Sequence, residues 1–115
     1  RSIVAIAEES RRLAASVRAG TATPAELTGA TFTISNLGMF GMTSIVPVIN
    51  PPQAAILGVG AAREELYLHD GQPTSRQVVS LTLRGDHRIL NGAEAARFLS
   101  DVKGLIEAPL RLLAA

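Results

Sequence analysis

Apolar positions recur at helical spacing in two stretches of the chain, residues 3–17 and residues 92–106. Charged and polar side chains take the remaining positions of both stretches, which is the pattern of a helix with one buried face. Gly20 supplies a stop for the first helix, which would have about five turns. Asn91 is a typical N-cap for the second helix, and Pro109 ends or restarts it. The pattern therefore predicts two substantial amphipathic helices.

Between these helices the hydrophobic pattern changes to short runs typical of β-strands. Residues 54–61 form a continuous apolar run, which indicates a strand buried on both faces. Asp70-Gly71 lies between two such segments and is a strong signal for a hairpin turn. We predict strands at residues 30–35, 45–49, 54–61, 65–69 and 74–83.

Two further signals predict turns. Thr23-Pro24-Ala25-Glu26 combines an N-cap threonine, a proline at the first helical position and a glutamate three residues after the cap, so it predicts a capping box on a short turn. Asn50-Pro51-Pro52 predicts a turn or an extended corner.

The order of helix, several strands and helix predicts an α+β domain with helices packed on a mainly antiparallel or mixed sheet. At 115 residues, the chain is one domain or part of one. Two helices are too few to cover both faces of a sheet of five strands. One face of the sheet could therefore be covered by another half-domain or by a subunit.

Composition narrows the function classes. The chain is 47% hydrophobic and only 3% aromatic, so its core must be aliphatic. Eleven basic and ten acidic side chains are spread without long runs and give a net charge of +1. A basic stripe with aromatic residues for base stacking is missing, and we therefore expect no nucleic-acid partner.

Cysteine is absent from the chain, which excludes disulfides, thiolate metal sites and a cysteine nucleophile. The most apolar stretch, residues 44–62, is interrupted by proline, asparagine and glutamine and cannot cross a bilayer as one helix. The chain opens directly into an amphipathic helix, without the apolar region of a signal peptide. These features predict a soluble, intracellular protein without a membrane partner.

Three consecutive ionisable residues, Asp86-His87-Arg88, follow the apolar strand and precede the second helix. A neutral imidazole can take a proton from a weak acid near physiological pH and return it, so His87 is a candidate general base. Asn91 could come close to it if the intervening segment turns. A charged, solvated turn in which His87 merely caps the chain is an equally open interpretation of this stretch.

Ser35 is the second candidate, because it ends a predicted strand that runs into Asn36-Leu37-Gly38. A hydroxyl beside such a glycine can donate a hydrogen bond to an oxyanion, although serines at strand ends more often bond only the backbone. His69 lies in the predicted hairpin turn and is best interpreted as an exposed loop residue. The two histidines lack a metal-ligand spacing, so we expect no metal site.

Three stretches together strongly resemble the catalytic domain of dihydrolipoamide acyltransferases, the core-forming components of 2-oxoacid dehydrogenase complexes. They are "GATFTISNLGMFG", "INPPQAAILGVGAA" and "SLTLRGDHRILNGAEAARFL", in this order. The opening "IAEESRRLAASVRAGTATPAELTGATFTISNLG" is also similar to the family's helix and lead-in. The family's catalytic domain is about twice this length, so the resemblance identifies residues 1–115 as its C-terminal half.

The resemblance implies a fold like that of chloramphenicol acetyltransferase, a mixed sheet with helices on one side, present here as a partial domain. It implies homotrimers within a larger core, with active sites in channels at subunit interfaces. Coenzyme A and dihydrolipoamide would enter from opposite ends, the lipoyl group being carried on a separate domain. Expected partners are that lipoyl domain and the other components of the complex, in the cytoplasm, or in the mitochondrial matrix if the source is eukaryotic.

The resemblance also assigns roles. His87 matches the histidine that deprotonates the thiol of coenzyme A, and the thiolate then attacks the acyl thioester on the lipoyl group. Ser35 matches the serine that donates a hydrogen bond to the tetrahedral oxyanion. Asn91 stands where the family most often has aspartate, so its expected role is to orient through hydrogen bonds rather than to move protons. Asn36, Leu37 and Gly38 are expected to contact coenzyme A.

The sequence leaves the acyl group and one other function open. "SNLGMFG" and "NPPQAAILGVG" look most like pyruvate dehydrogenase acetyltransferases and favour acetyl, but succinyl and branched-chain relatives share the histidine motif. A non-catalytic scaffold subunit is the alternative function. The presence of both His87 and Ser35 favours an enzyme. A free-standing small-molecule acetyltransferase has only the fold in its favour.

Overall fold

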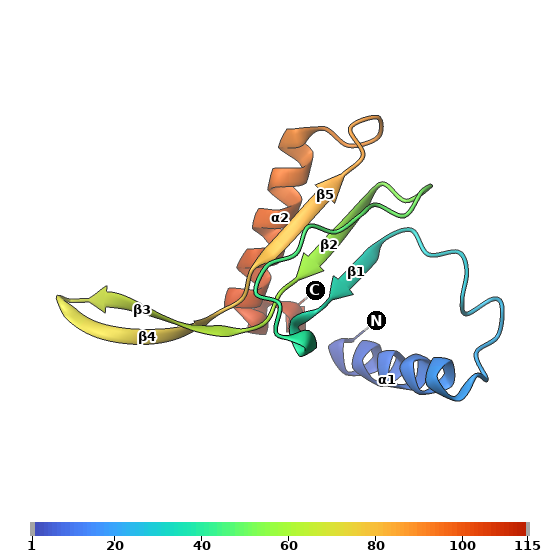
Figure 1. The fold of residues 1–115 in the computed structure, drawn as a ribbon, viewed down its shortest axis with the longest axis horizontal. Coiled ribbons are helices and arrows are strands. Elements are labelled where there is room, and N and C mark those ends of the chain that lie inside the picture. Colours follow the sequence, from blue (N-terminus) through green and yellow to red (C-terminus); the bar gives the residue numbers. More distant parts are fainter. Residues whose placement is uncertain (1, 115) are drawn as a thin grey trace. The chain divides into compact units, whose positions relative to one another are not determined.

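The computed structural model describes residues 2–114, and side chains are described through residue 113. The chain forms two compact units. One unit is Thr31–Ala96, and the other contains the described residues on either side of it. The secondary structure is that of an α+β domain, as the hydrophobic pattern predicts (Figure 1).

Helix α1 spans Ile3–Ala19 in the unit formed by the chain ends. Ser2 is its N-cap and accepts a hydrogen bond from the backbone N–H of Ala5 at 3.1 Å. Gly20 ends it in the left-handed conformation, with φ of 73°, and its N–H reaches the carbonyls of the last turn. The stop predicted at Gly20 is therefore confirmed, and glycine suits it because a side chain disfavours this φ.

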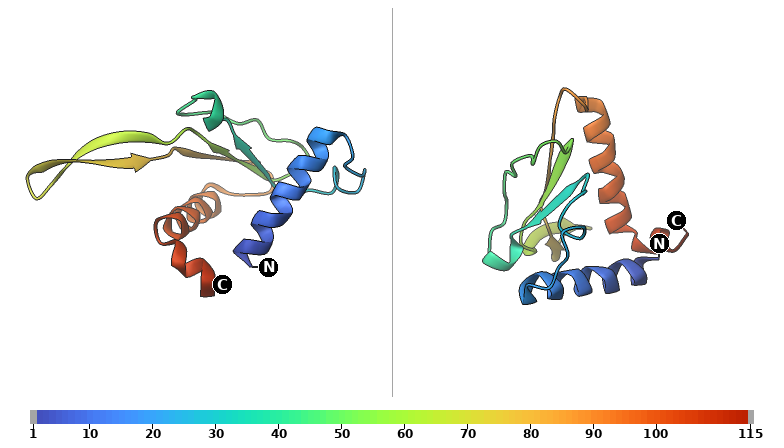
Figure 2. Two further views of the ribbon diagram at one scale, coloured as in Figure 1. Left: turned by 90° about the horizontal axis from the view of Figure 1, so that it is seen from below. Right: turned by 90° about the vertical axis from the view of Figure 1, so that its right-hand side faces the viewer.

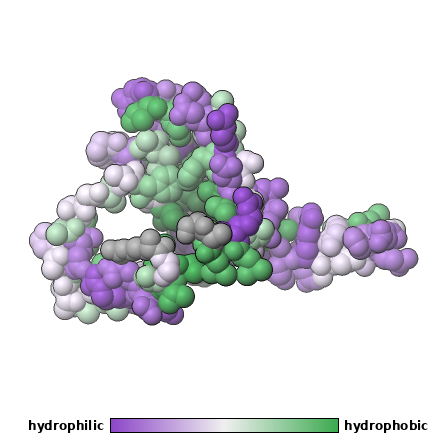
Figure 3. Space-filling view, turned by 180° about the vertical axis from the view of Figure 1, so that it is seen from behind, coloured by the Kyte–Doolittle hydropathy of each residue, from purple (hydrophilic) through white to green (hydrophobic). Residues whose placement is uncertain are grey.

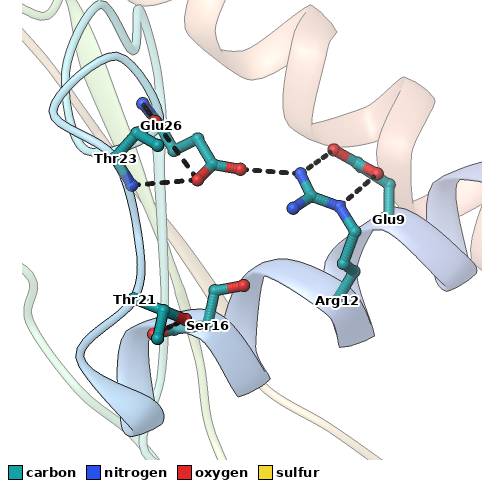
Figure 4. A network of polar contacts seen from close by, with 6 residues as sticks. All are labelled: Glu9, Arg12, Ser16, Thr21, Thr23 and Glu26. Atoms are coloured by element: carbon teal, nitrogen blue, oxygen red, sulfur yellow. Dashed lines mark hydrogen bonds and ion pairs between the residues drawn. The ribbon is translucent and has the colours of Figure 1, made fainter.

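The capping box predicted after α1 is present. The backbone N–H of Thr23 donates to the Glu26 carboxylate at 3.0 Å, and the N–H of Glu26 donates back to the Thr23 hydroxyl at 3.3 Å. Arg12 of α1 bridges this turn to the helix, because its guanidinium contacts both Glu9 and Glu26 (Figure 4). These contacts connect the turn at residues 23–26, which precedes the first strand in the chain, to α1.

The unit Thr31–Ala96 is built on a mixed sheet of three strands, ordered β1-β2-β5. The strands are β1 (Thr33–Asn36), β2 (Ala55–Val59) and β5 (Leu81–Gly85). β1 runs parallel to β2, whereas β2 and β5 are antiparallel. Helix α2 (Gly92–Glu107) follows β5, and the 3-10 helix Pro109–Ala114 comes after it.

The long hairpin of β3 (Arg63–His69) and β4 (Gln72–Val78) continues away from this sheet as a two-stranded arm (Figures 1 and 2). Asp70 and Gly71 at its tip both have positive φ, as the Asp-Gly signal predicts. Arg76 stabilises the arm across its strands, since its guanidinium bonds Glu65 at 3.0 Å and lies 4.7 Å from the centre of the Tyr67 ring. Hydrophilic residues cover most of the arm (Figure 3).

Two strand predictions differ from the structure. The predicted strand at residues 74–83 is broken at Val79-Ser80, where the chain passes from the hairpin to β5 in the other sheet. Residues 45–49 are not a strand, although they alternate between buried and exposed as a strand would. The reason is that they lie over the face of the sheet rather than beside its edge. Arg84 of β5 donates from its guanidinium to the Pro47 carbonyl at 3.3 Å.

We call residues 37–54, which connect β1 to β2, the crossover segment. A parallel pair of strands needs such a return path, which more often contains a helix. Here the path contains only the short 3-10 helix Gly38–Phe40 and is otherwise an irregular chain that runs along one side of the sheet (Figure 2, right). Its Ile45 is buried and joins three β2 residues, Ala55, Ile56 and Leu57, in the core of the described chain.

Truncating a β2 core residue should destabilise the fold far more than truncating a residue on the arm. Leu57 is 6% exposed and Leu66 of β3 is 76% exposed. We expect Leu57→Ala to lower the free energy of unfolding by about 2–4 kcal/mol, because it leaves a cavity, and Leu66→Ala to change it by about 0.5 kcal/mol or less. Urea unfolding followed by circular dichroism measures both, and equal effects would contradict this assignment of the core.

Candidate active site

The side chain of Ser35 emerges near the carboxyl end of β1. In the sheet register Ser35 lies opposite Gly58, which in turn lies opposite Thr82 of β5. Residues directly opposite one another in a sheet point to the same face. Ser35, Gly58 and Thr82 therefore form one row on one face, which we call the serine face, and Ser35 is half-buried in that row.

The residues after Ser35 form a tight turn whose polar groups are used within the chain. The Asn36 side-chain oxygen accepts from the N–H of Gly38 at 3.0 Å, and the N–H of Leu37 donates to the Val59 carbonyl at 3.2 Å. The backbone donors of this turn thus point into the chain. If Asn36, Leu37 and Gly38 contact coenzyme A, the contact involves their solvent-facing atoms and the side-chain NH2 group of Asn36.

His87 lies in an exposed turn immediately after β5. The Asp86 N–H donates to the Ala54 carbonyl at 2.7 Å, which extends the ladder between β5 and β2 by one bond. The Asp86 carbonyl accepts from Ile89 at 2.9 Å and from Leu90 at 2.8 Å, which closes the turn. The His87 imidazole is therefore presented to solvent by a backbone held on both sides.

Asp86 and Arg88 hold this turn from within. The Asp86 carboxylate accepts from the Arg88 backbone N–H and from Nε at 3.0 Å, and from Nη2 at 2.8 Å. The hydrogen bonds from the Arg88 side chain and backbone lower the pKa of Asp86 to about 2. This ion pair stabilises the turn, and the imidazole between the two residues takes no part in it.

Asn91 is the N-cap of α2, as the sequence predicts. Its side-chain oxygen accepts from the Glu94 backbone N–H at 2.8 Å, and its amide nitrogen donates to the Glu94 carboxylate. The cap fixes where α2 begins, four residues after His87. Asn91 and His87 therefore lie at the same end of the unit Thr31–Ala96, on either side of one short turn.

Ser35 and His87 are not brought together within one chain. Because β2 is antiparallel to β5 and parallel to β1, the carboxyl ends of β1 and β5 point in opposite directions (Figure 1). Ser35 is level with Thr82, and His87 follows Thr82 by five residues. At the usual rise per residue this places them on the order of 15 Å apart along the strands. The two candidates lie at opposite ends of one sheet.

Sequence reasoning misses Gly58 in β2, Gly60 just after β2, and the crossover residues that face them. A Cβ on Gly58 would lie 2.8 Å from Ile45 Cγ1, and one on Gly60 would lie 2.2 Å from the Thr43 carbonyl oxygen. The available signal is the glycine itself, since glycine within a strand often marks close approach of another backbone. The apolar run hides that signal, because it is interpreted as ordinary burial.

Comparison with known proteins gives the family. Residues 1–114 match the catalytic domain of 2-oxoacid dehydrogenases acyltransferase, and the chain belongs to this family. It is 42% identical over 114 residues to the dihydrolipoyllysine-residue acetyltransferase component of pyruvate dehydrogenase complex from Zymomonas mobilis, covering 99% of this chain and 26% of the relative. It is 45% identical over 112 residues to the mitochondrial dihydrolipoyllysine-residue succinyltransferase component of 2-oxoglutarate dehydrogenase complex from Saccharomyces cerevisiae, covering 97% and 24%.

Solved structures of such proteins have the same fold. A dihydrolipoamide acetyltransferase from Azotobacter vinelandii superposes with a TM-score of 0.86 at 36% identity, over 98% of this chain and 46% of that one. That structure belongs to an investigation of a serine, a histidine and an asparagine in the catalytic mechanism. The cubic core of a pyruvate dehydrogenase multienzyme complex gives a TM-score of 0.86 at 37% identity, over 98% and 46%.

The α+β class, the mixed sheet and the family are therefore confirmed. The chain spans about a quarter of the length of the curated relatives and slightly less than half of the solved chains. Among the described residues, no helix has the length and apolar character needed to cross a membrane.

The depressed pKa of Asp86 predicts how the histidine turn responds to acid. Its ordinary value of 3.8 falls to about 2 in the folded chain, so the ion pair with Arg88 is intact above about pH 4 and is lost as the pH falls through 2. Carboxyl-carbon NMR shifts followed against pH should give a midpoint near 2. Arg88→Gln keeps the backbone donor but removes the guanidinium, and should raise that midpoint. An ordinary midpoint in the unsubstituted chain would contradict the pairing.

Proposed function

We propose that this chain is part of an acyltransferase that moves an acetyl or related acyl group from dihydrolipoamide to coenzyme A. The proposal rests on two distances along the sequence, from a serine to a histidine and from that histidine to an asparagine. In the Azotobacter enzyme the investigated histidine follows the serine by 52 residues, and the asparagine follows the histidine by four. Ser35, His87 and Asn91 have the same two separations in this chain. Three residue types at matching intervals, within one fold and family, support the same catalytic set.

In the proposed mechanism, the imidazole of His87 accepts the proton of the coenzyme A thiol. A thiol has a pKa of about 8.5, so this transfer to an imidazole is not strongly uphill near neutral pH. The thiolate attacks the carbonyl carbon of the acyl-dihydrolipoamide thioester. The bond to the lipoyl sulfur then breaks, and that sulfur takes the proton back from His87. The products are acyl-coenzyme A and dihydrolipoamide.

Ser35 stabilises the intermediate of this reaction. The carbonyl oxygen becomes negatively charged when the thiolate adds, and a hydroxyl in place before the charge develops donates a hydrogen bond to it. Such a donor contributes about 3 kcal/mol in other oxyanion sites. Asn91 orients the histidine turn by fixing the start of α2. Asn36, Leu37 and Gly38 contribute surface to coenzyme A beside Ser35.

We further propose that each active site combines two copies of the chain. Ser35 and His87 lie at opposite ends of one sheet, so a single copy cannot place both at one thioester. The serine end of one copy meeting the histidine end of the next satisfies the geometry, and repetition of this head-to-tail contact closes a ring. A homotrimer within a larger core is the proposed arrangement, and relatives that form a cubic core support it.

The family indicates the partners and limits the acyl group to a few candidates. An acetyltransferase and a succinyltransferase are similarly close, at 42% and 45% identity, so overall identity does not choose between them. The segments around Gly38 and Gly58 favour acetyl. The lipoyl group is carried by a separate domain, and the other components of a 2-oxoacid dehydrogenase complex are the remaining partners. Bacterial and mitochondrial relatives support a location in the cytoplasm or the mitochondrial matrix.

A non-catalytic scaffold subunit of the same complex is the alternative function. It requires the core-forming fold but neither a base nor an oxyanion donor. An assay of acyl transfer to coenzyme A, carried out on the full chain and its assembly, distinguishes the enzyme from the scaffold. Acetyl- and succinyl-dihydrolipoamide offered in parallel as donors also identify the acyl group.

Removing the proposed base should greatly slow turnover without disturbing assembly. We expect His87→Ala to lower kcat by about 10²–10⁴-fold, the usual contribution of a general base. His69→Ala is the matched control, because His69 is the other histidine of the chain and lies at the hairpin tip. The control should keep the original kcat. Full activity in His87→Ala would remove the base assignment and favour the scaffold function.

Mixing two inactive variants should restore activity if the site is shared. In assemblies formed from equal amounts of Ser35→Ala and His87→Ala chains, an intact serine end meets an intact histidine end at about one quarter of random interfaces. The mixture, dissociated and reassembled together, should therefore recover about a quarter of the original kcat. Each variant reassembled alone is the control. Recovery no greater than the sum of the two controls would show that the residues do not act across copies.

A further inference from the structure

The crossover segment lies unusually close to β2 beside Ser35. Any heavy atom within 3.0 Å of a new Cβ must move, and Gly58 and Gly60 both fall under this limit. At Gly58 the obstacle is the side chain of Ile45, with Cγ1 at 2.8 Å and Cδ1 at 3.0 Å. At Gly60 it is the backbone of Thr43. The two glycines thus leave the space that the crossover chain occupies on the serine face.

Ile45 consequently stands next to the Ser35 side chain. Ser35 and Gly58 are direct neighbours on adjacent parallel strands, about 4.8 Å apart, and point to the same face. The Ile45 side chain fills the position that a Gly58 side chain would take, and it is only 8% exposed. On this face, a buried aliphatic group therefore occupies the place beside Ser35 where a Gly58 side chain would lie.

The turn after Ser35 is anchored to the same place. The Ala61 N–H donates to the Met42 carbonyl at 2.6 Å, and the Leu37 N–H donates to the Val59 carbonyl. A Cβ on Gly38 would lie 3.1 Å from both the Gly60 carbonyl oxygen and the Ala61 Cα. The end of β1, the end of β2 and the crossover segment are consequently locked together by backbone contacts, which fixes the direction in which the Ser35 Cα–Cβ bond points.

We propose that Gly58 and Ile45 are positioning residues for Ser35, with Gly60 anchoring the segment that carries Ile45. They set the direction of the Ser35 hydroxyl and keep water from one side of it. A donor to an oxyanion acts fully only if it is in place before the charge develops, and it is stronger where water is excluded. This inference rests on the proposed role of Ser35 and deepens it.

The test is a double-mutant cycle between Gly58 and Ser35, measured in the full chain and its assembly. Gly58→Ala should lower kcat by about 10-fold or more, change the KM for coenzyme A by less than about 3-fold, and leave the pH profile unchanged because His87 is not moved. Ser35→Ala alone should lower kcat by about 10²–10³-fold. In the double variant, Gly58→Ala should cost nothing further, because its effect acts through the hydroxyl.

Two additional variants keep the test decisive. Gly58→Ala combined with Ile45→Ala removes the colliding Ile45 atoms but also the aliphatic group beside Ser35, so its kcat should stay below the original value, and full recovery would overturn the role of Ile45. Ile45→Val removes only Cδ1, so it should fold even if Gly58→Ala does not. It is combined with Ser35→Ala in a second double-mutant cycle of the same design. Gly104→Ala is the matched control, because its Cβ meets only the flexible end of Arg111, at 3.3 Å.

The outcomes separate this inference from the function it rests on. If Ser35→Ala keeps full activity, the oxyanion role fails and the positioning role fails with it. If Ser35→Ala is impaired but the Gly58 or Ile45 variants leave kcat unchanged, only the positioning inference is overturned. Full additivity with Ser35→Ala, or losses that follow only a lower unfolding midpoint, would also overturn it.

Discussion

The parallel pairing of β1 with β2 is the constraint on which the rest of the unit Thr31–Ala96 depends. Parallel neighbours cannot be joined by a tight turn, so the chain must return along the sheet before β2 begins. In this protein the return path is the irregular crossover segment, which lies flat on the serine face instead of forming a helix above it. Ile45 is part of the core for this reason. The close approach of the crossover segment also requires glycine at residues 58 and 60.

The same pairing decides where chemistry is possible. β1 is parallel to β2 and β5 is antiparallel to it. The carboxyl ends of β1 and β5, which carry the candidate catalytic residues, therefore lie at opposite ends of the sheet. The serine is held by its neighbours on the sheet face, whereas the histidine is held by a turn whose carboxylate and guanidinium bind each other. Each end is thus rigid by itself. The distance between them is a property of the topology, and small local movements cannot remove it.

The sequence predicted local features well because the interactions that produce them are local. Gly20, the Thr23–Glu26 box and the Asn91 cap each depend on contacts within four or five residues, and all three are present. The apolar run at residues 45–49 predicted a strand, and this prediction was wrong, although its side chains alternate in burial as those of a strand do. Alternation reports which side chains are covered, and it is the same for a chain lying beside a strand as for one lying over it.

What the sequence could not reveal is non-local. The relation of Ser35 to His87 depends on strand direction, which hydrophobic patterns do not encode. The need for glycine at residues 58 and 60 depends on a segment more than ten residues away in the chain. The motif around Asp86 was recognisable, yet its internal ion pair, and the lowered pKa of Asp86 that results, emerge only when the turn is built.

The hairpin arm has a practical consequence. The side-chain contacts that Arg76 makes across the strands lie within the arm, and its outermost residues are the Asp70-Gly71 turn. Surface tips of this kind tolerate inserted sequence better than any strand interior. An epitope or a fluorescent reporter joined there would be separated from both the serine and the histidine ends, so the chain could be followed without altering its candidate catalytic residues.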